Sequence, residues 1–448
     1  MTRALLLKNA AVVVTMDDAR RELVDGWVLV EGGAIAALGT GAPPPAEQMI
    51  DLTGHVLMPG LVNTHHHMYQ SLTRAVPAAQ DAELFDWLGA LYPLWARMTP
   101  EALRIATLTA MAELILSGCT TAADHLYIFP NGCTLDDTIE AARAIGIRFQ
   151  PTRGAMSLGQ SKGGLPPDSV VEGEDVILTD MDRVVSRFHD PAPHSMLRIG
   201  IAPCSPFSVT RELMRDAALF ARGKGLRLHT HLAENDKDIA FTRERFHCTP
   251  AEYAEDLGWL GEDVWHAHCV HLDAAGIAAF ARSGTGVAHC PCSNMRLASG
   301  IAPIPAMRRA GVPIGLGVDG SASNDGAHML GEARQAMLLA RVGHGPAAMT
   351  ARQALEMATL GGARVLGRAG EIGALVPGMA ADLVAFDVQG IEQAGAADLV
   401  AALVFCTPPR VALSIIAGRV VVQGGMLLTL DERAHAAKHR VAAALLRQ

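Results

Sequence analysis

Residues 99–124 read TPEALRIATLTAMAELILSGCTTAAD, a helical pattern followed directly by a short apolar run. Thr99 suits the N-cap of a helix, Pro100 its first position and Gly118 its end. The run at 119–124 is typical of a buried strand. A helix that ends against a strand is the repeating unit of a parallel α/β fold, so this stretch predicts the architecture of the middle of the chain.

The same alternation recurs throughout residues 58–370. Seven further apolar runs are each followed by a helical pattern, at Val56–His65, Ile147–Thr152, Leu197–Ala202, Leu226–His231, Val264–His268, Gly286–His289 and Ile314–Asp319. Eight βα units predict an α/β protein with a closed (β/α)8 TIM barrel, whose active site lies at the C-terminal ends of the strands. The Gly/Pro-rich stretch 159–167 predicts a long loop that serves as a lid or wall of that site.

The two ends of the chain have a different pattern. Residues 1–57 contain the β-branched runs 11–14 and 27–30, and residues 371–448 contain similar runs at 382–387, 413–416 and 419–422. Glycines separate these runs, as expected for turns between strands. Because chain termini often lie close together, we expect both ends to form one small sheet domain beside the barrel of residues 58–370.

Composition narrows the class of protein. The 448 residues are 50% hydrophobic and 19% charged, which excludes intrinsic disorder. A net charge of −9 argues against a nucleic-acid-coating surface and an anionic membrane partner. No apolar run reaches the roughly 18 residues of a membrane helix, and the apolar part of residues 1–8 is too short for a signal peptide. The eight cysteines follow no disulfide pattern, so we expect a reduced, soluble, cytoplasmic protein.

The first cluster of candidate functional residues is the run His65-His66-His67, which ends an apolar strand. Alternate residues of a strand face the same side, so His65 and His67 can aim at one point while His66 faces the other way. Two neutral imidazoles on one face suit a borderline metal such as zinc. The alternative is an accidental surface run.

The second cluster, HTHLAE at 229–234, ends another apolar strand. His231 is a candidate third ligand, and His229 shares its strand face and could take that role instead. The carboxylate of Glu234 can turn back over a metal and transfer protons. The alternative is that Glu234 caps the following helix.

Two further strand ends carry residues of the same kind. His268 ends the sixth strand, in a stretch that also contains His266 and His271, and two of these three are expected to be merely packed or exposed. Asp319 ends a glycine-rich strand, where it could ligate a metal and accept a proton from water. Four such clusters at the ends of strands 1, 5, 6 and 8 together predict a metal centre.

The motifs PGLVNTHHH, HTHLAE, HAHCVHL, HCPCSN and GVDGSASN together resemble the amidohydrolase superfamily, in its cytosine/guanine-type aminohydrolase branch. The resemblance covers nearly the whole chain and implies a (β/α)8 barrel with a composite β-sandwich built from the two ends. It also implies one divalent metal, most simply Zn²⁺ with Fe²⁺ as the alternative. The implied ligands are His65, His67, His231 and Asp319, with Glu234, His268 and Asp319 as catalytic residues.

Departures from the pattern of the family bear on the number of metals. Relatives with two metals carry a bridging lysine near the end of strand 4, whereas residues 201–206 here read IAPCSP. One metal is therefore expected, although the thiolate of Cys204 could also ligate. Cys290 and Cys292 are expected to be structural, because a single pair at this spacing is a weak metal signal.

The resemblance implies a hydrolytic deamination. Water activated by the metal gives its proton to His268 and Asp319 and attacks an amidine carbon of a heteroaromatic ring. Glu234 protonates the neighbouring ring nitrogen, and ammonia leaves. Gln70 occupies the position that contacts the substrate in this family, and its amide suits a lactam-amidine edge. Arg153 could reach a ring oxygen, or could instead form a salt bridge to a helix.

The longer stretches, such as HHHMYQSLTRAVPAAQDAELFDWL, are most similar to 8-oxoguanine deaminases, which implies 8-oxoguanine and water as substrates and urate and ammonia as products. The alternatives are deamination of a hydroxy-s-triazine (hydroxydechloroatrazine), isocytosine, isoxanthopterin or guanine. A remote alternative is a scaffold without catalysis, which the complete ligand set disfavours. The expected partners are a small heteroaromatic substrate and further copies of the chain in a homo-oligomer, with neither nucleic acid nor membrane.

Overall fold

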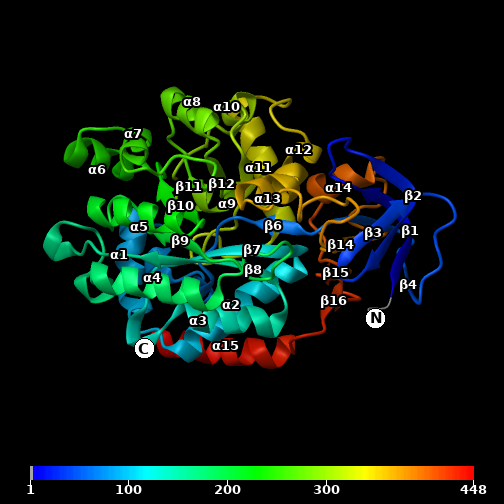
Figure 1. The fold of residues 1–448 in the computed structure, drawn as a ribbon, viewed down its shortest axis with the longest axis horizontal. Helices are drawn as coiled ribbons and strands as arrows, with labels where there is room; N and C mark the ends of the chain where they lie inside the picture. Colours follow the sequence, from blue (N-terminus) through cyan, green and yellow to red (C-terminus); the bar gives the residue numbers. More distant parts are fainter. Residues whose placement is uncertain (1–3) are drawn as a thin grey trace.

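A computed structural model describes residues 4–448, so the first three residues of the predicted segment 1–57 lie outside it. Its largest element is a closed barrel of parallel strands in the order β10-β11-β12-β13-β6-β7-β8-β9, surrounded by helices (Figure 1). The barrel strands are β6 (Leu61–Asn63), β7 (Cys119–Leu126), β8 (Arg148–Ala155), β9 (Gly200–Pro203), β10 (Arg227–Leu232), β11 (Val264–His268), β12 (Gly286–His289) and β13 (Ile314–Leu316). The predicted (β/α)8 barrel is confirmed.

The expected first strand, 56–65, divides at Gly60 into two strands that belong to different sheets. β5 (His55–Pro59) pairs with β1 (Leu5–Val14) and β14 (Leu383–Asp387), whereas β6 enters the barrel beside β7 and β13. A Cβ atom at Gly60 would lie 2.0 Å from the Thr120 hydroxyl oxygen, so the crossing of the chain here requires glycine. The ligand-type histidines therefore follow the sheet domain by only a few residues.

The second sheet confirms that the two ends of the chain fold together. It has nine strands in the order β17-β16-β15-β14-β5-β1-β2-β3, with β4 paired to β1. In Figure 1 the blue N-terminal strands lie beside the orange-red C-terminal ones, at one end of the molecule. The strands other than β5 are β1 (Leu5–Val14), β2 (Glu22–Glu31), β3 (Ala34–Gly39), β4 (Gln48–Asp51), β14 (Leu383–Asp387), β15 (Leu413–Ile416), β16 (Arg419–Gln423) and β17 (Met426–Leu427).

This sheet has its own hydrophobic core, in which side chains from both ends of the sequence pack together. Leu7 and Val28 of the N-terminal strands share it with Leu383 and Ile415 of the C-terminal strands. Neither half could bury these side chains alone, which explains why a segment from each end is needed.

The helices cover the outside of the barrel and form its connections. The longer ones are α1 (Leu84–Trp95), α2 (Pro100–Leu116), α3 (Leu135–Ile145), α4 (Glu174–Phe188), α5 (Arg211–Gly223), α6 (Asp236–Phe246), α8 (Ala274–Ser283), α11 (Met329–His344) and α15 (Glu432–Leu446). The shorter ones are α7 (Pro250–Asp256), α9 (Pro291–Arg296), α10 (Ile304–Ala310), α12 (Ala351–Glu356), α13 (Gly362–Val365) and α14 (Leu399–Phe405), with short 3-10 turns such as η1 (Met68–Thr73). Among residues 4–448, no helix is long and apolar enough to cross a bilayer.

The helix predicted from residues 99–118 forms as expected. The Thr99 hydroxyl accepts a hydrogen bond from the Ala102 N–H at 3.3 Å, and Gly118 leaves the helix with a φ of 94°. α15 packs against α2 along the lower edge of Figure 1, so the C-terminal segment also contacts the barrel.

A buried ion pair joins the barrel to the second sheet. Arg148, at the start of β8, donates two hydrogen bonds to the Asp382 carboxylate, at 2.8 and 2.9 Å, and both side chains are almost fully buried. Asp382 directly precedes β14 and also accepts a hydrogen bond from the Ala417 N–H. The pair therefore fixes the position of the sheet against the base of the barrel.

We expect Asp382→Asn to lower the free energy of unfolding by about 3–5 kcal/mol, because it leaves the Arg148 charge buried without its partner. Urea unfolding followed by circular dichroism measures this change. The matched control is Asp182→Asn, which removes the exposed ion pair between Asp182 and Lys224 and should cost less than about 1 kcal/mol. Equal effects of the two substitutions would contradict a structural role for the buried pair.

Candidate metal centre and pocket

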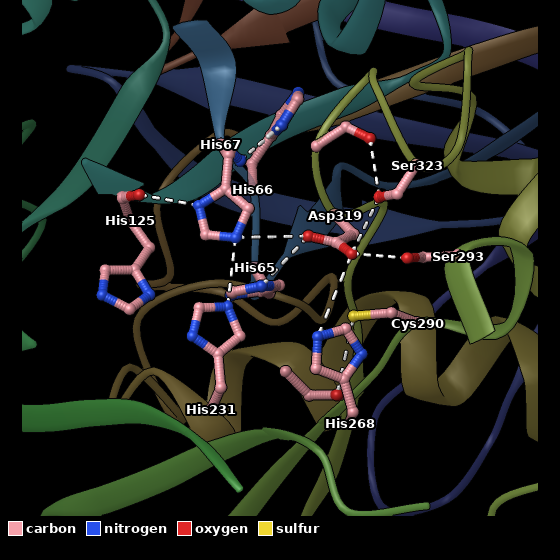
Figure 2. A network of polar contacts seen from close by, with 12 residues as sticks. His65, His66, His67, His125, His231, His268, Cys290, Ser293, Asp319 and Ser323 are labelled. Carbon is pink, nitrogen blue, oxygen red and sulfur yellow. Dashed lines mark hydrogen bonds and ion pairs between the residues drawn. The ribbon is translucent and has the colours of Figure 1, made fainter. Parts of the chain in front are cut away.

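Four ligand-type side chains meet at the C-terminal ends of the barrel strands. His65 and His67 follow β6, His231 lies near the end of β10, and Asp319 follows β13. Figure 2 shows all four pointing toward a common centre. All are buried. The structure therefore brings together the four residues that the sequence analysis selected as ligands.

The atoms that face this centre are hydrogen-bond acceptors. His67 and His231 donate their Nδ1–H groups to the carbonyl oxygens of His125 and Cys204, each at 2.7 Å, so in the neutral rings Nε2 carries no proton. The two Nε2 atoms lie 3.1 Å apart, and the Nε2 atoms of His65 and His67 each lie 3.3 Å from Asp319 Oδ1.

Such a convergence of lone pairs is unfavourable unless a cation lies between them. Ligands about 2.0–2.2 Å from a tetrahedral zinc ion lie roughly 3.3–3.6 Å from one another, close to the spacings found here. Burial lowers the pKa of His231 to about 3 and also lowers the pKa values of His65 and His67, so the rings stay neutral as metal ligands must. The residues therefore fit a divalent metal.

His66 is turned away from this centre, as the alternation of strand residues predicts (Figure 2). Its Nδ1 accepts a hydrogen bond from the His67 backbone N–H at 2.9 Å. The three consecutive histidines are all buried, so the run is no accident of the surface.

His229 shares the strand face of His231, but its ring contacts the Nδ1 side of His65 and does not face the centre where the four ligand atoms converge. Its Nδ1–H donates to the Trp265 carbonyl at 2.9 Å, and its Nε2 lies 2.8 Å from His65 Nδ1. Of the other histidines near β11, His266 is buried and His271 is exposed, as expected for two of the three. His266 donates to the Trp259 carbonyl and His271 to the Ser299 carbonyl.

Glu234 and His268 lie beside the four-residue centre. Glu234 Oε2 is 3.5 Å from His268 Nε2, which is in turn 3.9 Å from Asp319 Oδ2. The N-cap of α6 is Asn235, whose side chain accepts from the Asp238 N–H, so Glu234 is not the capping residue. Burial raises the pKa of the Glu234 carboxyl to about 7, against the opposing effect of His268, which suits proton transfer near neutral pH.

The second carboxylate oxygen of Asp319 is held by two hydroxyl groups. Ser293 and Ser323 donate to Oδ2 at 2.6 and 3.1 Å, which leaves Oδ1 facing the histidines. Asp319 and His268 both adopt left-handed backbone conformations, with φ values of 58° and 72°. Strain of this kind in residues other than glycine is typical of functional sites.

The cysteines near the site are not arranged as ligands. Cys204 Sγ lies 3.8 Å from His231 Nδ1, on the side of the ring away from the converging Nε2 atoms. Burial raises the pKa of its thiol to about 12, so it stays protonated. Cys290 is buried with its thiol near the Ala288 carbonyl, and burial also raises the pKa values of the Cys290 and Cys292 thiols.

A cavity opens onto the centre. Its polar lining includes Gln70, whose Oε1 and Nε2 are both buried and have no hydrogen-bond partner. A Cβ atom at Gly320 would lie 1.8 Å from Gln70 Oε1, so a larger residue there would displace the amide. The apolar and aromatic lining consists of Leu84, Trp87, Leu88, Tyr92, Tyr127, Phe207 and Leu297.

The wall of this cavity comes partly from α1, which supplies Leu84, Trp87, Leu88 and Tyr92. The loop at 159–167 was expected to be a lid or wall, but it contributes none of the residues that line the cavity. It contains the short turn η4 (Gln160–Lys162) and folds back on itself, with the Gly164 N–H donating to the Gly159 carbonyl.

The expectation that Arg153 contacts the substrate is wrong, and the salt-bridge alternative is the one that forms. Its guanidinium donates to Asp180 of α4 at 2.6 Å and to Glu172 at 2.9 Å, and it stacks over the Phe129 ring at 3.8 Å. The neighbouring Gly154 lies against His125 on the inside of the barrel, so alternation along β8 turns Arg153 outward.

Besides the serines that hold Asp319 and the apolar lining, His125 and Asn294 are residues of the site that the sequence analysis did not select. His125 stacks on His231 with ring centroids 4.9 Å apart, donates from Nε2 to the Ala202 carbonyl, and keeps a buried Nδ1 without a partner. Its place at the end of an apolar strand was the available signal. Asn294 Oδ1 accepts a hydrogen bond from His268 Nδ1 at 3.0 Å, which leaves His268 Nε2 facing the pocket.

Known proteins match this chain along most of its length. The sequence model described as the Amidohydrolase family matches residues 56–421. An 8-oxoguanine deaminase of Pseudomonas aeruginosa is 46% identical, over 98% of each chain. A hydroxydechloroatrazine ethylaminohydrolase of Pseudomonas sp. (strain ADP) is 37% identical, over 94% of this chain and 91% of its own.

A solved structure has the same fold. The crystal structure of an atrazine chlorohydrolase from Arthrobacter aurescens TC1, complexed with zinc, superposes with a TM-score of 0.95 at 33% identity. The match covers 98% of this chain and all of the other. The similarity thus extends over both the barrel and the sheet formed by the two ends.

Proposed function

The chain belongs to the amidohydrolase family, and from that premise we propose that it is a metal-dependent deaminase that converts 8-oxoguanine and water into urate and ammonia. The observation that carries the proposal is the set of converging acceptor atoms beside the buried Glu234, at the floor of a cavity lined by aromatic side chains. The 46% identity to an 8-oxoguanine deaminase supports the choice of substrate.

We propose that His65, His67, His231 and Asp319 hold one divalent ion. Three nitrogen donors and one carboxylate oxygen suit zinc, and ferrous iron remains the alternative. When bound, the ion supplies Lewis acidity that activates water near neutral pH. Zinc in the similar atrazine chlorohydrolase structure supports this choice.

The remaining roles follow from the positions of the side chains. Asn294 holds His268 with Nε2 free, so His268 and Asp319 can accept the proton that the attacking water loses. With a pKa of about 7, Glu234 can donate a proton to the ring nitrogen next to the carbon that water attacks. The proton that His268 and Asp319 accepted from water can then pass to the amino group on that carbon, which leaves as ammonia.

We propose that the Gln70 amide recognises the substrate by hydrogen bonds to one edge of its ring. This amide carries a donor and an acceptor that are both buried and unpaired, and such groups are costly unless a ligand or water satisfies them. The lactam and amidine groups of an oxo-purine offer the complementary acceptor and donor. The aromatic walls suit a flat ring.

The other substrates share the reacting group. The 37% identical relative supports a hydroxy-s-triazine as the second candidate, and isocytosine, isoxanthopterin and guanine present similar edges. A scaffold without catalysis is disfavoured because every proposed ligand position is filled. We also propose a reducing compartment such as the cytoplasm, because all eight cysteines are free thiols. The homo-oligomer stays a prediction.

We expect kcat/KM for 8-oxoguanine to exceed that for guanine by at least about 100-fold, which corresponds to roughly 2.7 kcal/mol of transition-state binding. Guanine lacks the C8 oxygen and the N7 proton, so any buried polar group that binds this edge of 8-oxoguanine would be left unpaired when guanine binds. Ammonia release from 8-oxoguanine, guanine, isocytosine, isoxanthopterin and hydroxylated triazines measures the preference. Isocytosine loses contacts without a clash and should be turned over.

Equal turnover of guanine and 8-oxoguanine would contradict the assignment and indicate an ordinary guanine deaminase. Activity on hydroxylated alkylamino-triazines alone would favour the second candidate.

A further inference from the structure

The three histidines of the proposed metal centre are oriented in two different ways. His67 and His231 donate Nδ1–H to backbone carbonyl oxygens, which accept at fixed positions. His65 differs, because its Nδ1 lies 2.8 Å from the Nε2 atom of another side chain, His229. An imidazole nitrogen can either donate or accept, so this contact alone does not determine where the proton lies.

The second ring nitrogen of His229 determines the direction of the hydrogen bond between His229 and His65. His229 Nδ1 lies 2.9 Å from the Trp265 carbonyl oxygen, which can only accept, so Nδ1 carries the proton. In the neutral ring Nε2 is then an acceptor, and His65 must donate to it from Nδ1. His65 Nε2 is left without a proton, and this is the atom that lies 3.3 Å from Asp319 Oδ1.

The surroundings of His229 hold its ring in place. The side chain is 1% exposed. Its ring stacks on Trp265 with centroids 4.5 Å apart and an interplanar angle of 17°. A rotation that broke either hydrogen bond would also disrupt this stacking.

We propose that His229 is a positioning residue that fixes the Nδ1–H tautomer of His65 and so presents the His65 Nε2 lone pair to the metal. The proposal rests on the proposed metal site. Groups that orient a metal-ligating histidine in this way typically contribute about 10–100-fold to metal affinity. His65 depends on a replaceable side chain for this orientation, whereas His67 and His231 depend on the backbone.

Two substitutions of His229 separate this role from simple packing. Gln places an amide oxygen near the position of Nε2 and can still accept from His65. Asn is one carbon shorter, so its amide can donate to the Trp265 carbonyl but its oxygen cannot reach His65. We expect His229→Asn to weaken zinc binding by about 10–100-fold and His229→Gln by less than about threefold.

The measurement is competition of the zinc-loaded enzyme with a chromophoric chelator, with thermal unfolding recorded on the same samples. His266→Asn is the matched control, because His266 is also buried and also donates to a backbone carbonyl, but on the outside of the barrel. It should lower stability and leave zinc affinity within about threefold of the wild type. Equal affinity in the Asn and Gln variants, or a tenfold loss in the Gln variant, would overturn the proposal.

A spectroscopic readout keeps the proposal testable if the Asn variant fails to fold. In the cobalt-substituted enzyme, the Nδ1–H protons of the three ligand histidines should give three strongly shifted, exchangeable NMR signals. The Gln variant should retain all three. Two signals in the wild type would overturn the proposal for His229, whereas a wild type that binds neither zinc nor cobalt would refute the metal site itself.

Discussion

Replacement of Glu234 by glutamine is expected to lower kcat by two to four decades while the metal content stays at the level of the wild type. The substitution keeps the shape of the side chain but removes the proton that the ring nitrogen needs, and one positioned proton transfer typically contributes about 10²–10⁴-fold. Glu234 Oε2 approaches His268 at 3.5 Å and lies outside the four converging ligands, so the ion should remain. Steady-state kinetics and elemental analysis of the same preparation measure both quantities.

The matched control for this prediction is Glu332→Gln. Glu332 is equally buried, and burial raises its carboxyl pKa to about 7 as well, but its partners are the Asn324 amide and the Cys292 backbone N–H. Its replacement should change kcat by less than about tenfold. Near-wild-type turnover in Glu234→Gln would reduce Glu234 to a structural residue.

The second large effect is expected from two neighbouring histidines. His67→Ala should abolish stoichiometric metal binding and with it turnover, because His67 Nε2 lies 3.1 Å from His231 Nε2 and 3.3 Å from Asp319 Oδ1. His66→Ala should keep the metal, because the His66 ring faces away from the four ligands and accepts a hydrogen bond only from the His67 backbone N–H. The metal content of the two variants, measured after gel filtration, should be near zero for His67→Ala and near that of the wild type for His66→Ala.

His66 is fully buried, so its alanine variant will lose some stability. His66→Asn offers a second test, since its side-chain oxygen can still accept the His67 N–H. If both His66 variants lost the metal while His67→Ala kept it, His66 and not His67 would be the residue that faces the metal centre.

Alternation along strands accounts for most of what the sequence predicted correctly. It separated His66 from His65 and His67, and the order of apolar runs predicted the barrel and its eight strands. The same rule could have excluded Arg153 from the pocket, had Gly154 been recognised as the inward-facing residue. The error came from treating any polar residue at a strand end as part of the site.

Roles that depend on hydrogen-bond direction could not be predicted in this way. Strand alternation places His229 and His231 on one strand face. The structure distinguishes them by what their Nε2 atoms face, which is His65 Nδ1 for His229 and His67 Nε2 for His231. Asn294 and Ser293 lie in α9, and their contacts with His268 and Asp319 depend on how that short helix meets the barrel. Such contacts join segments that are distant in sequence and leave no periodic signal.

The pairing of β5 with β14 has a consequence for how the chain folds during synthesis. β5 is central in the second sheet, and its partner β14 is translated only after the whole barrel. Until then, the nascent chain exposes one unpaired edge of β5, and unpaired edges promote association between chains. We therefore expect fragments that end before residue 383 to aggregate when expressed, and the last stage of folding to follow release of the C-terminal strands from the ribosome.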